Sequence, residues 1–311
     1  MTSSEILTSR DIQRWIYYEV NRPGLMPWID AVCTAPIAAP NGQLKLAALG
    51  AFRPLRKFAA PRTTEDFSTI PITVDCSDYE TGYRVTLKEM RRDMTGLLRA
   101  SIGQAIGKPV NERWQSIVTA RLEAGSTDTA PSDGVTFFSA SHTRYKSGTQ
   151  GNLLTSAAAT GTVPTTAEMQ AALWGLIKNH FTMKDDQGLP LNTGASFTCM
   201  VPISFMQPAV EAVKGAVVEL SGSLRANSLQ MIDGVDISLT ANPYLTTTDS
   251  FYLMANDGLG IVRAEEFAPK IDSKAEGSDY EFDNQAHIHG VMVSMAAKLF
   301  RWESIQKHTF T

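Results

Sequence analysis

Cysteine is scarce in this chain, and long apolar runs are missing. The 311 residues contain three cysteines, Cys33, Cys76 and Cys199. They form neither a CxxC pair nor the dense pattern of a disulfide framework, so we expect packing residues in a reducing or redox-indifferent compartment. No run approaches the ~18 apolar residues of a membrane span. The first residues also lack a basic segment followed by an apolar one. The sequence therefore predicts neither a secreted nor a membrane-bound class.

The common catalytic motifs are missing as well. No GxxxxGK[ST] occurs, and GLG at 258–260 lacks the third glycine, the helix and the distal acid of a dinucleotide site, which favours a turn. Ser139, Ser141 and His142 lie together with Asp133 upstream, but no GxSxG places a nucleophile on a strained turn. A polar turn after a strand is the favoured interpretation, and catalysis is the alternative.

One sequence pair has the spacing of metal ligands. His287 and His289 are two residues apart in a strand-like segment, so both side chains point to one face. A catalytic site needs a third ligand, for which Glu281 and Asp283 are the nearby candidates. A metal-dependent hydrolase is therefore an alternative function, although packed or surface histidines of a strand are favoured.

Periodicity predicts an α+β protein. At ~150 residues per domain the length suggests about two folding units, or one elaborate one. We expect a helix over 4–20, a proline-rich extended arm over 21–44 that must pack on something else, and a long hairpin or loop over 45–83. A long helical region follows over 85–124, where Pro109 should kink the helix or start a second one.

The second half alternates helices and strands. Thr165 and Glu168 have the spacing of a capping box before an apolar helix face. Strands are expected around 196–205, 235–245 and 250–256, a helix over 208–220, and a mostly extended segment from 287 onward.

Charge is separated along the chain although the total is only −4. Residues 45–62 carry five basic side chains and no acid, 63–83 carry five acids and no base, and 265–283 carry seven acids against two bases. The basic segment has three interpretations: a solvated face, contact with the acidic surface of another copy, or a DNA-binding module in which Phe52 and Phe58 stack on bases. The balanced total argues against a protein whose whole surface binds nucleic acid.

Several segments together resemble a known family. They are LGAFRPLRKFAAPR at 49–62, DYETGYRVTLKEMRRDMTG at 78–96, LEAG at 122–125, and DGVTFFSASH with GNLLTS over 133–156. The loop DDQGLPLN, the segment FTCMVPISF and NPYL follow in order. This order and spacing, from about residue 45 to 300, resembles the major head subunits of Mu-type tailed bacteriophages, which have the Hong Kong 97-type capsid fold.

The resemblance implies four structural parts. Residues 1–44 would be the N-terminal arm, 45–80 an extended loop, 81–158 with 262–311 a peripheral domain around a spine helix, and 159–261 an axial domain. It implies a structural protein without catalytic residues, metal or cofactor, which self-assembles into hexamers and pentamers of an icosahedral shell around double-stranded DNA. No membrane is involved, and no sequence-specific DNA binding. The location would be the virion, with assembly in the host bacterial cytoplasm.

The resemblance also implies partners and contacts. Portal, scaffold and decoration proteins are the further partners expected beside other copies of the chain. Some relatives crosslink a loop lysine to an asparagine, but only Lys57 lies near the loop tip and no catalytic acid is identified, so we predict no crosslink. The expected assembly contacts join a basic set to an acidic set: Lys45, Arg53, Arg56, Lys57 and Arg62 on one side, and Glu265, Glu266, Asp272, Glu276, Asp279, Glu281 and Asp283 on the other.

Overall fold

The computed structural model confirms the α+β class. It describes residues 9–22, 27–49, 69–93, 95, 97–143, 147–159, 161–185, 187–191, 195–220, 223–231 and 234–311. The expected contact residues Arg53, Arg56, Lys57 and Arg62 lie outside the described residues. Across these ranges, no helix combines the length and apolar character needed to cross a bilayer.

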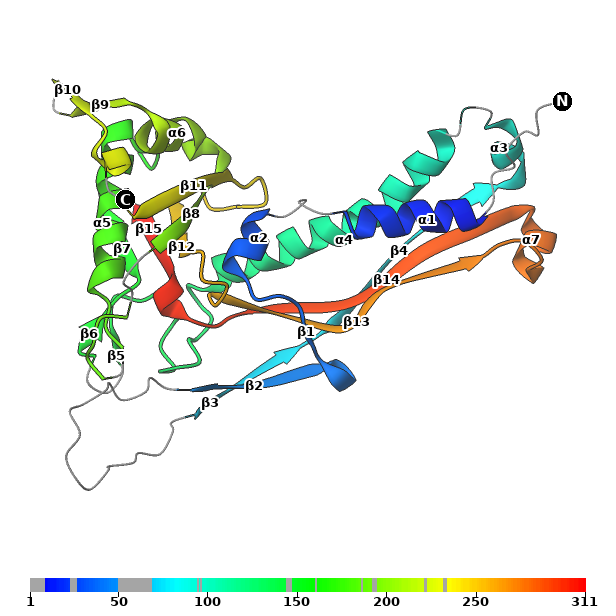
Figure 1. Cartoon of the computed structure of the whole chain (residues 1–311), viewed down its shortest axis with the longest axis horizontal. Coiled ribbons are helices and arrows are strands. Elements are labelled where there is room, and N and C mark those ends of the chain that lie inside the picture. The colour runs from blue at the N-terminus through cyan, green and yellow to red at the C-terminus, as the bar shows by residue number, and fades with distance from the viewer. Residues whose placement is uncertain are drawn as a thin grey trace.

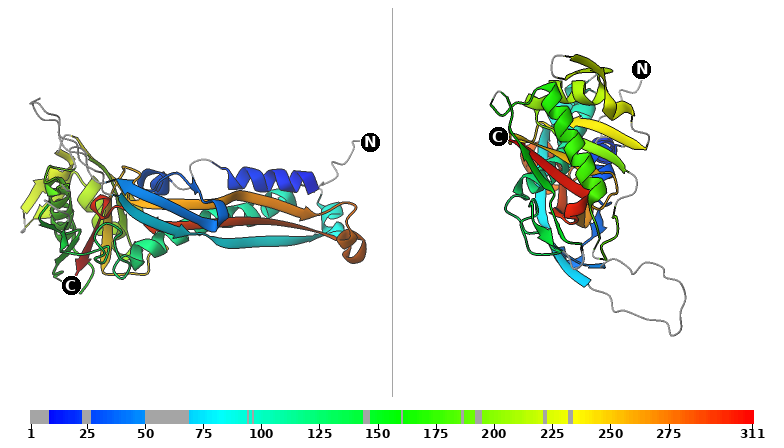
Figure 2. Two further views of the ribbon diagram at one scale, coloured as in Figure 1. Left: turned by 90° about the horizontal axis from the view of Figure 1, so that it is seen from below. Right: turned by 90° about the vertical axis from the view of Figure 1, so that its left-hand side faces the viewer.

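The helices and strands divide between two ends of an elongated body (Figures 1 and 2). The helices are α1 Ser9–Val20, α2 Pro27–Val32, α3 Leu87–Arg92, α4 Leu97–Ala124, α5 Thr166–Thr182, α6 Met206–Lys214 and α7 Asp279–Asn284. The strands are β1 Ile37–Ala38, β2 Gln43–Leu49, β3 Thr69–Asp75, β4 Ser77–Thr86, β5 His142–Thr143, β6 Thr149–Gln150, β7 Leu153–Ser156, β8 Ala195–Val201, β9 Val217–Leu220, β10 Ser223–Ala226, β11 Val235–Ala241, β12 Ser250–Ala255, β13 Ile261–Lys274, β14 Ala286–Leu299 and β15 Ile305–Phe310.

A long, narrow sheet forms one end of the body, in the order β1-β13-β14-β4. β13 and β14 pair antiparallel from Ile261↔Leu299 to Lys274↔Ile288. The spine helix α4 lies across one face of this sheet (Figure 1). Its side chains Ile106, Val110 and Trp114 are buried in the same core as Val291 and Val293 of β14. Burial of large apolar side chains is the main favourable term that holds the helix to the sheet.

The predicted helical region 85–124 is correct for most of its length, with two corrections. Residues 85–86 belong to β4, and the helix divides into α3 and α4. The division has a local cause, because the carboxylate of Asp93 accepts the backbone N–H of Leu98 at 3.0 Å and so caps the new helix. Pro109 lies inside α4, which continues through it as one element, so the option of a second helix beginning there is wrong.

The N-terminal arm differs from the expected extended segment. The helix over 4–20 is confirmed from residue 9 onward, but 21–44 contains α2, β1 and a short 3-10 turn. Trp28, Ile29 and Val32 of α2 are buried in the core of the long sheet. Arg263 fastens the arm from β13, since its guanidinium donates to Thr34 O at 2.7 Å and lies 3.0 Å from Asp30 Oδ1. The arm therefore packs on its own chain.

β2 and β3 form a hairpin within the range 45–83, where a long hairpin or loop is predicted. The prediction is wrong for residues 77–83, which belong to β4 of the long sheet. The two hairpin strands pair antiparallel from Gln43↔Asp75 to Leu49↔Thr69. A small apolar cluster that includes Leu44, Ile72 and Val74 attaches the hairpin base to β13. Lys298 of β14 also donates to Thr73 O at 2.9 Å. The described hairpin thus has a firm base and a thin core, as its sequence indicates.

The other end of the body is a five-stranded sheet in the order β11-β8-β12-β15-β7, covered by α5 and α6. The capping box of α5 is confirmed, because Thr165 Oγ1 accepts the N–H of Glu168 and the Glu168 carboxylate accepts the N–H of Thr165. The helix predicted over 208–220 is wrong beyond Lys214, where the chain turns at Gly215 and enters β9. A Cβ at Gly215 would meet Glu211 O at 2.3 Å, so this turn needs glycine.

Candidate functional site: assembly surfaces and the catalytic alternatives

The two strand histidines, His287 and His289, are buried on one face of β14, as their spacing predicts. Their ring centroids are 6.4 Å apart, and His287 Nε2 lies 3.1 Å from Glu281 Oε1. Asp283, the other expected ligand, is exposed on α7. Within the described ranges, no group of three or more His, Cys, Asp or Glu side chains is arranged to hold a metal ion. Burial, with a smaller effect of His287, lowers the pKa of His289 from 6.5 to about 4, which fits a neutral packing residue.

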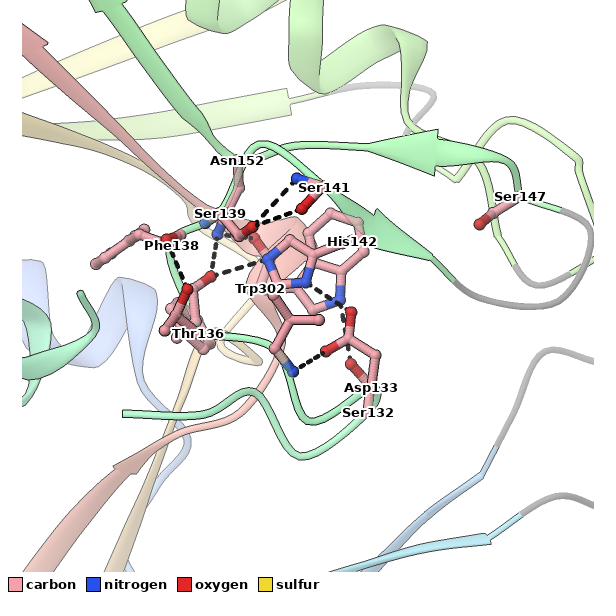
Figure 3. A network of polar contacts seen from close by, with 12 residues as sticks. Ser132, Asp133, Thr136, Phe138, Ser139, Ser141, His142, Ser147, Asn152 and Trp302 are labelled. Carbon is pink, nitrogen blue, oxygen red and sulfur yellow. Dashed lines mark hydrogen bonds and ion pairs between the residues drawn. The ribbon is translucent and has the colours of Figure 1, made fainter. Parts of the chain in front are cut away.

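The network around His142 has the residue types of a triad in a different arrangement (Figure 3). His142 Nδ1 lies 2.7 Å from Asp133 Oδ2, and His142 Nε2 lies 3.1 Å from Phe137 O. A carbonyl oxygen only accepts, and an ionised carboxylate only accepts. Each ring nitrogen of His142 thus has an oxygen within hydrogen-bond distance, and the ring is held between Asp133 and Phe137.

The nearby serines do not complete a catalytic group. Ser139 Oγ lies 3.3 Å from Ser141 Oγ, and neither hydroxyl bonds His142. A general base for serine needs a free ring nitrogen within hydrogen-bond reach, and both nitrogens of His142 are already used. The polar turn that the sequence favoured is the arrangement seen.

The same network has a structural role. The His142 ring stacks on Trp302, with centroids 4.1 Å apart and planes at 9°. The side-chain amide of Asn152 donates to Phe137 O, Trp302 O and Ile305 O at 2.9, 3.2 and 3.0 Å. These contacts join the segment after α4 to the turn that leads into β15. They connect the two ends of the body at a buried, fully hydrogen-bonded point.

The cysteines and the GLG segment also follow their structural interpretations. Burial raises the pKa of Cys33 and of Cys199 to about 12, which suppresses the reactive thiolate. Burial and neighbouring carboxylates raise the pKa of Cys76 as well. Gly258 lies in a turn with φ of 66°, as expected for GLG.

The acidic stretch 265–283 divides into two groups. Along β13, Glu266 and Asp272 are exposed, whereas Glu265 is half-buried and desolvation raises its pKa. Around α7, the side chains of Glu276, Asp279 and Asp283 are exposed.

Glu281 differs from the other acids because it faces inward. Its carboxylate accepts the N–H of Gly277 at 2.7 Å and contacts His287. These interactions lower the pKa of Glu281, with the His287 hydrogen bond as the largest cause. Of the expected basic contacts, Lys45 is described and is exposed on β2.

Exposed apolar side chains reveal surfaces that the sequence analysis missed. On α1, Tyr17 and Tyr18 are exposed beside the buried Ile16. At the end that holds the five-stranded sheet, Met206 is exposed at the start of α6. At the opposite end of the body, Phe282 on α7 is 82% exposed (Figure 1). The sequence pattern that could have predicted these surfaces is a short helix with apolar residues on both faces. Such a helix buries one face in its own chain and presents the other to a partner.

Comparison with known protein families finds a match over part of the chain. Residues 29–167 match the model of the family described as Mu-like prophage major head subunit gpT. That range contains the hairpin, β4, the spine helix, and Asp133, His142 and Asn152 of the His142 network. No curated protein matches the chain significantly.

Solved structures extend the likeness over nearly the whole chain. The capsid structure of cyanophage P-SCSP1u is similar with a TM-score of 0.59 and 10% identity, over 91% of this chain and 87% of that one. The mature capsid of bacteriophage PhiM1 gives a TM-score of 0.59 and 12% identity, over 89% and 85%. This chain has the capsid fold of tailed phages. The procapsid of bacteriophage JBD30 is similar with a TM-score of 0.53 and 13% identity, over 96% of this chain and 73% of that one.

The resemblance to Mu-type major head subunits and the Hong Kong 97-type fold class are thereby confirmed. The family match over 29–167 and the capsid fold agree with the structural role that the sequence implies. Neither the metal-dependent hydrolase with His287 and His289 nor the DNA-binding module over 45–62 gains support.

Proposed function

We propose that copies of this chain assemble into hexamers and pentamers, which close into an icosahedral shell around the double-stranded DNA of a tailed bacteriophage. The capsid fold carries this proposal, together with the family match over 29–167. Other copies of the chain are the main partner, and portal, scaffold and decoration proteins are further ones. The shell encloses DNA without sequence-specific contacts and is assembled in the cytoplasm of the host bacterium.

The division into parts stays a proposal with one refinement. We keep an arm over 1–44, an extended loop over 45–80, a peripheral domain over 81–158 and 262–311, and an axial domain over 159–261. Strands β7 and β15 pair with each other within the five-stranded sheet, although both lie outside 159–261. We therefore add these two strands to the axial domain.

The loop contact is the proposed mechanism of assembly. The segment 50–68 follows β2, which pairs with β3 from Gln43↔Asp75 to Leu49↔Thr69. Its basic residues Arg53, Arg56, Lys57 and Arg62, with Lys45 on β2, would dock on the acidic residues of an adjacent copy. Of those acids, Glu266 and Asp272 on β13 and Asp279 and Asp283 on α7 are exposed for such a contact. Each exposed pair contributes only ~0.2–1 kcal/mol, so the effect depends on repetition over many copies.

Electron microscopy of the purified full chain tests the proposal. The wild type should form capsomers or closed shells, and the double variant Arg53→Glu with Arg56→Glu should remain folded but lose them. Lys178→Glu with Lys214→Glu makes the same change of charge on exposed residues of α5 and α6 and serves as the control. Small globules of wild type at all concentrations would refute the shell, whereas normal shells from the loop variant would refute only the docking of the loop.

A further inference from the structure

The outer side of α1 carries a stripe of hydrogen-bond donors. α1 lies along the spine helix α4 and beside β13, on one face of the long sheet (Figures 1 and 2). Ile12 and Ile16 are fully buried on its inner side. The opposite side carries five exposed side chains at positions i, i+4, i+7, i+8 and i+11, which share one face of a helix: Arg10, Arg14, Tyr17, Tyr18 and Asn21. We call these five residues the α1 face.

The exposed charge on the α1 face is positive. Among the described residues, neither Arg10 nor Arg14 forms an ion pair. Of the two acids of the helix, Glu19 is buried and lies 3.6 Å from the guanidinium of Arg22, and Asp11 is half-buried. The two free guanidinium groups are four residues apart, which is about 6 Å along a helix axis. This arrangement suits an anionic ligand whose charges repeat.

Contacts on the inner side of α1 hold the α1 face in place. The side-chain amide of Gln13 donates to Ser273 Oγ of β13 at 2.6 Å, and that of Asn111 in the spine helix donates to Glu19 O at 3.3 Å. At the end of the helix, the Asn21 amide donates to Tyr17 O at 2.9 Å. A ligand therefore meets side chains on a backbone that is already ordered, which lowers the entropic cost of binding.

The residue types of the α1 face match the backbone of a nucleic acid. Arginine, tyrosine and asparagine side chains all donate to phosphate oxygens, and a guanidinium can do so with two parallel hydrogen bonds. α1 has 12 residues and is therefore about 18 Å long. That length covers about five base pairs of duplex DNA at about 3.4 Å each. No exposed aliphatic side chain lies on the described residues of α1, so the affinity of this face would come mainly from its donors and charge.

We propose that the α1 face binds the phosphate backbone of double-stranded DNA without reading its sequence. Arg10 and Arg14 would pair with phosphates, and the hydroxyl groups of Tyr17 and Tyr18 would donate to phosphate oxygens. This assigns the DNA contact to α1 and not to the basic segment 45–62. It rests on the proposed function, because a shell brings many copies of the face to one DNA molecule and so makes a weak single contact effective.

Fluorescence anisotropy with a short duplex of random sequence tests the contact. The full chain is used at a concentration where sedimentation shows single subunits, so that the α1 face is accessible. The wild type should bind, and its affinity should fall as salt is added. Arg10→Gln with Arg14→Gln should bind on the order of 10- to 100-fold more weakly in about 0.1 M salt, because each lost phosphate contact lowers the salt slope by about 0.9. Arg91→Gln with Arg92→Gln makes the same change on exposed residues of α3 and should bind as the wild type does.

The outcomes separate the DNA contact from the shell. Salt-sensitive binding that is weakened in the α1 variant and kept in the α3 variant, at unchanged melting temperatures, supports the contact. It does so even if the wild type forms no shells in electron microscopy, a result that would refute the proposed function alone. A wild type that does not bind the duplex, equal binding by the α1 variant, an equal loss in the α3 variant, or tighter binding of a single strand of the same length overturns the contact. An α1 variant that binds DNA normally but fails to assemble would identify another copy as the occupant and would overturn it as well.

Discussion

Gly107 of the spine helix lies directly against Glu19 of α1. A Cβ on Gly107 would come within 2.7 Å of Glu19 Cβ and 3.1 Å of Ile16 O. One turn earlier, a Cβ on Gly103 would come within 2.7 Å of Trp15 Cβ. Asn111 completes the contact, since its amide donates to Glu19 O at 3.3 Å and so satisfies a terminal carbonyl of α1. The arm helix and the spine helix therefore approach at a distance that only glycine permits.

Substitution Gly107→Ala should detach or displace α1. The new methyl group meets backbone and Cβ atoms that cannot rotate away, and such overpacking costs about 1–3 kcal/mol. The gain in helix propensity, about 1 kcal/mol, offsets only part of that cost. Urea unfolding should show the net loss, and hydrogen exchange should show it concentrated in residues 9–20.

The matched control is Gly175→Ala in α5. A Cβ there would lie 3.6 Å from Leu154 Cδ2, an ordinary contact. The same exchange in a helix should therefore stabilise the protein by roughly 0.5–1 kcal/mol. Equal effects of the two substitutions on stability would show that the close approach at Gly107 is unimportant.

Local signals allowed part of this fold to be predicted from the sequence. The capping box of Thr165 and Glu168 lies within four residues and is therefore visible in the sequence. The β2–β3 hairpin and the strand that carries His287 follow from the alternation of apolar and polar residues and from the turn residues. The arm was misjudged because Asp30 and Arg263 are more than two hundred residues apart in the sequence and meet only in the fold. The sequence also does not predict which acids of 265–283 are exposed. Residue spacing does not show that Glu281 faces inward while Phe282 faces outward.

Acid should destabilise the folded subunit through its buried histidines. The pKa of His289 falls from 6.5 to about 4 because burial disfavours the charged ring. The folded state thus binds this proton less readily than the unfolded state does. Above pH 6.5 the ring is neutral in both states, and the free energy of unfolding is not reduced. As the pH falls from 6.5 toward 4, the unfolded state takes up the proton first, and the free energy of unfolding falls by roughly 3 kcal/mol in total. Burial likewise lowers the pKa of His180 and His308 to about 4, so both act in the same window.

The variant His289→Leu isolates the contribution of this one ring. Unfolding free energies measured in urea at pH 7 and pH 5 should differ less in the variant than in the wild type. The reason is that leucine takes up no proton when the chain unfolds. A pH dependence identical to that of the wild type would exclude His289 as a source of acid sensitivity.

Covalent crosslinking should be absent from mature particles. Lys57 is the single lysine near the expected loop tip, and it lies outside the described residues. Particles boiled in detergent should give one band near the subunit mass of 33.9 kDa. A ladder of multiples of that mass that disappears in Lys57→Arg would refute this expectation and identify the lysine.

Removal of the Asp133 charge should be far more costly than removal of an exposed one. Asp133→Asn removes the carboxylate that lies 2.7 Å from His142 Nδ1, in a site where the histidine side chain is 0% exposed. Breaking a buried pair from one side typically costs about 3–5 kcal/mol. The control is Asp128→Asn, since Asp128 lies 3.7 Å from Arg121 in a pair whose side chains are 45% and 51% exposed, where a loss of about 0–1 kcal/mol is expected. Equal losses of stability in the two variants would show that the buried contact of Asp133 with His142 does not stabilise the fold. The hydrogen bonds of Asn152 and the stacking on Trp302 would then be left to join the two ends of the body.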